Sequence, residues 1–136
     1  MRILGIDPGE INIGVALSDV TGTLARPLLI LKHSSRTEDA KAITQLAKKH
    51  DVRLIIIGQS IDEDGQPTFT GRKARRLAGA VRTETLIPVD LWDESNSTQE
   101  SRSARIAQGV GRDKRSGHLD ATAAAIILQS YINTNL

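Results

Sequence analysis

Acidic residues stand where three segments of predicted regular structure begin or end. Asp7 follows one apolar run, Asp93 and Glu94 follow another, and Asp120 falls in the first turn of a predicted C-terminal helix. Carboxylates are oxygen ligands that Mg²⁺ and Mn²⁺ prefer, usually together with water and substrate phosphates. Two such ions about 4 Å apart activate water and stabilise the leaving oxygen in phosphodiester hydrolysis. We therefore expect Asp7, Asp93, Glu94 and Asp120 to hold Mg²⁺ or Mn²⁺, with Asp7, Glu94 and Asp120 as the catalytic residues.

These acids also have a simpler interpretation as capping and turn residues. Asp120 would stabilise the positive end of a helix dipole whether or not it binds a metal. For a single Asp this structural role is the better interpretation. The occurrence of Asp7, Glu94 and Asp120 together, at one edge of one predicted sheet, favours the chemical role.

Basic residues gather in two stretches that could contact a phosphate backbone. One stretch begins a predicted helix, and the other runs through a glycine-containing loop toward Asp120. Lysine and arginine side chains that contact phosphates release counterions and dominate the affinity for nucleic acid. A solvated helix face is the alternative, and the acidic residues 62–64 could pair with the first stretch. The residues that we expect to bind nucleic acid are Lys114, Arg115, Arg112, Arg72, Arg76 and Thr98.

Alternating strands and helices must position these residues. Strands are predicted at residues 2–6, 11–18, 24–31, 52–57 and 86–92, and helices at residues 37–50, 70–83, 97–109 and 117–132. This order predicts an α/β fold with a five-stranded mixed sheet flanked by helices, in which the first, fourth and fifth strands are parallel and central. Ligands in such sheets bind beyond the carboxyl ends of the parallel strands, which is where the acids fall.

The composition is that of one globular domain spanning residues 1–136, with 39% hydrophobic and 25% charged residues and a net charge of +2. The absence of cysteine excludes a disulfide framework, Cys-ligated zinc, an iron–sulfur cluster and a thiol nucleophile.

No apolar run approaches the ~20 residues of a membrane span, and no signal peptide is recognisable, so we expect a cytoplasmic protein without a membrane partner. Phe69, Trp92 and Tyr131 are the only residues of their types, so nucleic-acid binding must rest on charge rather than on many stacked bases.

Three sequence motifs, in this order along the chain, resemble those of the YqgF/RuvX family. They are Gly-Ile-Asp-Pro-Gly through Gly-Val-Ala-Leu-Ser-Asp at residues 5–19, Trp-Asp-Glu-Ser-Asn-Ser-Thr at residues 92–98, and the Asp-Ala-Thr-Ala segment that opens residues 120–129. The resemblance implies a ribonuclease H-like fold, which is that of the RuvC Holliday-junction resolvase. It also implies either resolution of Holliday junctions or maturation of the 5′ end of pre-16S ribosomal RNA.

The resemblance assigns the acids residue by residue. Asp7 matches the first acid of the family, Glu94 matches the Glu of its Asp-Glu-Arg motif with Asp93 as the Asp, and Asp120 matches the acid that opens the last helix. Metal binding by these residues is therefore also what the resemblance implies.

The chain departs from the family pattern at three places. Asn12 and Ser95 stand where the family usually has arginine, and Gln59-Ser60 replaces a Leu-Pro pair. Loss of two arginines removes two possible bidentate phosphate contacts. The departures therefore bear on how the substrate is held, and on which substrate it is, rather than on the metal.

The function expected from these residues is metal-dependent endonucleolytic cleavage of structured RNA or branched DNA, by a monomer or a homodimer. One alternative is a non-catalytic nucleic-acid-binding or ribosome-assembly protein that keeps the fold. Another is a nucleotide-binding phosphotransferase, because the first motif also resembles the phosphate loop of actin-like and sugar-kinase ATPases. Those proteins need two such domains around the nucleotide, and 136 residues supply one.

Overall fold

The computed structural model describes residues 1–93 and 121–136, and the account below is confined to them. Its centre is a five-stranded sheet in the order β3-β2-β1-β4-β5. The strands are β1 (Arg2–Asp7), β2 (Asn12–Ser18), β3 (Ala25–Lys32), β4 (Val52–Gln59) and β5 (Val89–Asp93). The first three strands form an antiparallel meander, while β4 and β5 run parallel to β1. The predicted mixed sheet is therefore confirmed.

One part of the predicted topology is wrong, because β5 is an edge strand and not a central one. The short connection of residues 8–11 places β2 on one side of β1, and β4 occupies the other side. The last parallel strand pairs with the outer side of β4. The central strands are β2, β1 and β4.

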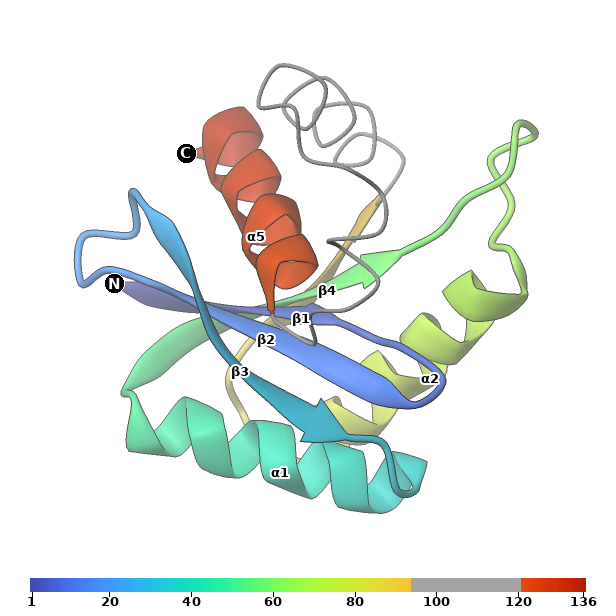
Figure 1. The fold of residues 1–136 in the computed structure, drawn as a ribbon, viewed down its shortest axis with the longest axis horizontal. Coiled ribbons are helices and arrows are strands. Elements are labelled where there is room, and N and C mark those ends of the chain that lie inside the picture. Colours follow the sequence, from blue (N-terminus) through green and yellow to red (C-terminus); the bar gives the residue numbers. More distant parts are fainter. Residues whose placement is uncertain (94–120) are drawn as a thin grey trace, which may run out of the picture.

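Helices cover both faces of the sheet (Figure 1). Helix α1 (Arg36–Lys49) and helix α2 (Phe69–Glu84) lie together on one face, and α5 (Thr122–Asn135) is the helix described on the other. The Ser35 hydroxyl accepts a hydrogen bond from the Glu38 amide at 3.1 Å, so Ser35 is the N-cap of α1. Thr68 caps α2 in the same way through the Gly71 amide at 3.2 Å.

The predicted beginning of the last helix at residue 117 is wrong. Helix α5 begins at Thr122, and the preceding Ala121 has the non-helical angles φ −95° and ψ 26° and makes no side-chain cap. Residues 117–120 of the predicted helix, Asp120 among them, lie outside the described residues. Apolar spacing indicates which face of a helix is buried, but it does not determine where the backbone becomes helical. The helix predicted at residues 97–109 lies outside the described residues.

Alternation along β4 divides the core into two layers. Ile55 and Ile57 are buried toward α1 and α2, whereas Leu54 and Ile56 are buried toward α5. This is the two-faced burial expected of a central parallel strand. No helix in the described part of the chain is long and apolar enough to cross a membrane.

Candidate metal site

Asp7 lies at the carboxyl end of β1, half-buried, opposite Gly14 of β2. A Cβ on Gly14 would stand 3.6 Å from the Cβ of Asp7, 3.4 Å from the Cβ of Ala124 and 3.7 Å from the Cα of Ala121. Asp7 and the beginning of α5 therefore lie against the same glycine. Because Ala121 directly follows Asp120 in the chain, the fold brings the backbone next to Asp120 to the strand end that carries Asp7.

Strand register relates Asp7 to the end of β5. Ile6 is level with Ile57, and Ile57 is level with Leu91, so the position of Asp7 is level with Gly58 and Trp92. Neighbouring strands are about 4.8 Å apart, which separates β1 from β5 by roughly 10 Å across β4. The Asp7 position and the end of β5 are therefore two strand spacings apart at the same edge of the sheet.

Asp93 lies on the other face of the sheet from Asp7. Leu91 packs in the layer of α1 and α2, and Trp92 packs in the layer of α5. Since side chains alternate along a strand, Asp93 belongs to the side of Leu91, whereas Asp7 shares the α5 side with Gly14. Of the four predicted metal ligands, the structure describes Asp7 and Asp93 and does not bring their side chains together. Glu94 and Asp120 lie outside the described residues, among which no three acidic or histidine side chains form a metal-binding group.

Trp92 fastens the end of β5 to α5. Its indole nitrogen donates to the Ser130 hydroxyl at 3.2 Å, and its ring meets the Tyr131 ring edge-on at a centroid distance of 5.5 Å. Burial, and then the nearby Asp90 carboxylate, raise the pKa of Tyr131, so this ring stays uncharged at neutral pH. The strand end that precedes Glu94 is thus held in place by the helix that follows Asp120.

Only part of the predicted basic surface can be placed. Arg72 donates to the Pro67 carbonyl at 3.1 Å, and the Arg75 Nε donates to Gln59 at 2.9 Å. The carboxylate of Asp62 accepts the amides of Asp64 and Gln66 within its own loop. In the described ranges, no ion pair joins the acidic residues 62–64 to the basic residues of α2. The other predicted nucleic-acid contacts, Lys114, Arg115, Arg112 and Thr98, lie outside those ranges.

A cavity of about 250 Å³, which the sequence patterns did not predict, lies between the loop after β1 and the two helices α1 and α2. Arg36, Lys73 and Arg76 line it, together with His33 and Asp39. The spacing of Lys73 and Arg76, three residues apart on one helix, was the available signal. The fold was needed to show that Arg36 of α1 and the loop after β1 also line this cavity.

The chain has the ribonuclease H-like fold that is seen in RuvC structures. A structure described as T. thermophilus RuvC in complex with Holliday junction substrate matches with a TM-score of 0.66 and 16% identity, covering 98% of this chain and 94% of that one. A second Thermus thermophilus RuvC structure matches with a TM-score of 0.60 and 21% identity, covering 98% and 96%. At these identities the likeness establishes the fold, and the predicted ribonuclease H-like fold is confirmed.

The sequence identifies the family. The model of the RuvX family, described as Holliday junction resolvase, matches residues 1–134, and the chain belongs to this family. A protein named "Putative pre-16S rRNA nuclease" from Thermoanaerobacter pseudethanolicus is 36% identical over 135 residues, covering 98% of this chain and 97% of the relative. One of the same name from Caldanaerobacter subterraneus is 38% identical over 136 residues, with the same coverage. The predicted membership in this family of nucleases, which hydrolyse phosphodiester bonds, is confirmed.

Proposed function

We propose that this chain is a divalent-metal-dependent endonuclease that acts on structured nucleic acid. The observation that carries the proposal is the position of Asp7, a half-buried carboxylate at the carboxyl end of a central strand, against the same glycine as Ala121. This is the edge at which sheets of this type bind ligands. Asp7, Glu94 and Asp120 would then share one end of the sheet.

The residues of this edge fit a Mg²⁺ or Mn²⁺ site. Asp7 offers hard oxygen ligands, and Gly14, which lies between Asp7 and Ala121, adds no side chain there. Asp7, Glu94 and Asp120 would hold the cation or cations, which supply an activated water and charge neutralisation at the leaving oxygen. Asp93, on the opposite face, is the weakest of the four predicted ligands.

The residues of this chain hold the proposed metal ligands in place. Asp7 is anchored by a strand that is paired on both sides, and Trp92 ties the end of β5 to α5. Ligands on rigid elements keep their geometry when a charged substrate arrives. Arginine and lysine side chains near this edge would orient the phosphate backbone for attack.

We propose precursor 16S ribosomal RNA, processed at its 5′ end, as the first substrate to test, because relatives with 36% and 38% identity over nearly their whole length carry that name. A four-way DNA junction is the second, because the family model is described as a resolvase. Processing of a single RNA strand requires only a monomer, whereas symmetric cleavage of a junction requires a two-fold homodimer. We place the reaction in the cytoplasm, where ribosomal precursors are made.

The test is cleavage of a labelled precursor-rRNA leader and of a labelled junction, with Mg²⁺, Mn²⁺ or EDTA. Asp7→Asn should lower the cleavage rate by about 10³-fold, since metal stabilisation of the transition state is worth several kcal/mol. Asp51→Asn is the matched control: it makes the same change in the turn between α1 and β4, at a residue whose φ of 54° asparagine tolerates. Equal rates for Asp7→Asn and wild type would refute the assigned site. Binding of both substrates without cleavage in any metal would favour the non-catalytic alternative.

A further inference from the structure

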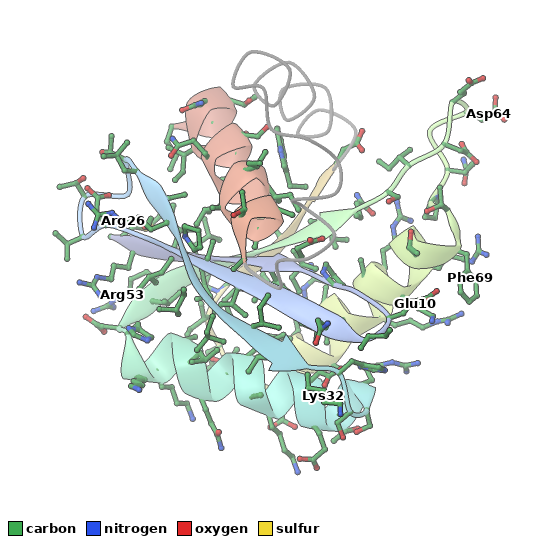
Figure 2. The ribbon with its side chains drawn as sticks, viewed as in Figure 1. Glu10, Arg26, Lys32, Arg53, Asp64 and Phe69 are labelled. Atoms are coloured by element: carbon green, nitrogen blue, oxygen red, sulfur yellow. The ribbon has the colours of Figure 1, made fainter. Side chains whose placement is uncertain are left out.

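The cavity between α1 and α2 lies across the sheet from Asp7. Its walls come from Pro8 and Gly9 after β1, from Arg36 at the beginning of α1, and from Lys73 and Arg76 on α2. Asp7 faces α5, whereas the cavity opens on the side of α1 and α2, so the loop of residues 8–10 separates the two. In Figure 2, Glu10 of this loop lies toward Phe69 of α2, at the opposite end of the molecule from Arg26 and Arg53.

Positive charge dominates this cavity. Arg36, Lys73 and Arg76 line it, and in the described part of the chain Arg36 and Arg76 make no hydrogen bond or ion pair. The acids on its wall are Asp39 and the exposed Glu10. Two guanidinium groups on one cavity wall without a carboxylate partner form a site that favours an anion.

In the described residues Asp39 forms no ion pair with these arginines, because its two oxygens contact other groups. One oxygen contacts the His33 Nδ1, and the other accepts the Ser34 amide at 3.0 Å. Asp39 is 5% exposed and stands in the first turn of α1. The carboxylate thus fixes the loop before α1 and leaves the guanidinium donors of Arg36 and Arg76 for a ligand.

The size and the surroundings of the cavity favour a phosphate of a polynucleotide strand. A volume of about 250 Å³ falls below the ~300–1,000 Å³ of pockets that enclose a whole small molecule. Phe69 is 58% exposed, and the Lys73 Nζ lies 4.7 Å from the centre of its ring. An exposed aromatic ring beside a phosphate-binding cation is the arrangement that holds a base and its adjoining phosphate in single-strand binding sites.

We propose that this cavity binds a backbone phosphate of the substrate strand, away from the cleaved bond, through Arg36, Arg76 and Lys73. The proposal rests on the proposed nuclease function, because the strand that reaches the cavity is the one that Asp7 helps to cut. The loop of residues 8–10 directly follows Asp7 and forms part of the cavity wall, so a strand crossing this loop connects the two sites. Arginine suits this role because its planar fork binds phosphate in a bidentate manner.

The experiment measures binding of a fluorescent single-stranded RNA in EDTA, so that no cleavage occurs. Arg36→Ala and Arg76→Ala should each weaken binding about tenfold, as expected for loss of a charge-assisted hydrogen bond. The double variant should also lower the salt-dependence slope by about 0.7, the value for one phosphate on a single strand. Arg53→Ala is the matched control, because it removes the same charge from an exposed residue at the opposite end of the sheet. Equal affinities for the double variant and Arg53→Ala would overturn the proposal.

A second experiment distinguishes binding of a phosphate in a nucleic-acid strand from binding of a free anion. Inorganic pyrophosphate should raise the Tm weakly, and Phe69→Ala should weaken RNA binding while leaving this rise unchanged. If pyrophosphate binding depends on Arg36 and Arg76 while RNA binding does not, the cavity serves a free anion and the proposal is overturned. Loss of RNA binding in the double variant, with Asp7→Asn cleaving as wild type does, would support the cavity and reject the nuclease site. Unchanged RNA binding in the double variant, together with loss of cleavage in Asp7→Asn, would support the nuclease site and reject the cavity.

Discussion

Gly5 in β1 lies directly against Leu128 in α5: a Cβ on Gly5 would stand 2.7 Å from the Cβ of Leu128 and 3.3 Å from the Ala124 carbonyl oxygen. The absence of a side chain lets α5 approach the central strand closely. The same close approach brings Ala121, at the beginning of α5, to within contact distance of the Gly14 position beside Asp7. Gly5 therefore contributes to the distance between the two ends of the candidate metal site.

Gly5→Ala should destabilise the protein by about 1–3 kcal/mol, because the added methyl group must push α5 away from the sheet. Gly79→Ala is the control, since a Cβ on this glycine inside α2 meets nothing within 4 Å. That change should stabilise by roughly 0.5–1 kcal/mol through the better helix propensity of alanine. Urea unfolding measures both, and equal effects of the two substitutions would contradict the close approach of α5.

Bound Mg²⁺ or Mn²⁺ should stabilise the folded chain through Asp7. A ligand that binds only the folded state at 100 times its Kd adds roughly 2.7 kcal/mol, which is several degrees in Tm for a domain of this size. EDTA should remove this increase, and Asp7→Asn should largely abolish it, whereas Asp51→Asn should keep it. Thermal unfolding with graded metal is the measurement, and an undiminished shift in Asp7→Asn would place the metal elsewhere.

Trp92 and Ser130 should be energetically coupled. Ser130 is 1% exposed, so Ser130→Ala leaves the Trp92 indole N–H without its partner and should cost about 1 kcal/mol. In a Trp92→Phe background the donor is already absent, and the same substitution should cost clearly less. A double-mutant cycle by chemical denaturation measures the coupling. Strictly additive costs would mean that the hydrogen bond contributes nothing to stability.

Asp19 should make stability depend on pH in the acid range. The Thr21 hydroxyl at 2.7 Å and the backbone amides of Thr23 and Leu24 lower the pKa of Asp19 from 3.8 to about 2. The folded-state pKa is depressed, so the stabilisation is complete above about pH 4 and is lost as the pH falls toward 2. Asp19→Asn should unfold more readily than wild type at pH 5, with the difference shrinking toward pH 2. A difference independent of pH would contradict the charge-assisted contacts.

Local patterns in the sequence predicted most elements to within a few residues. The serine before α1, the apolar run of β4 and the turn residues after β1 act through short-range physics, namely capping, two-faced burial and tight-turn geometry. The beginning of α5 was missed because apolar spacing continues beyond the helix that the backbone forms. The order of the parallel strands was missed at β5, because edge or central position depends on which partners are already paired.

The sequence by itself determined the family, the mixed sheet, and Asp7 as the acid that ends the first strand. Only the tertiary structure decided that Asp7 faces α5 while Asp93 faces away, because a change of one residue along a strand reverses the side of the sheet. Only the tertiary structure showed that Arg36, Lys73 and Arg76 line the same cavity. These residues are distant in the chain, and packing of two helices on one sheet face brings them together.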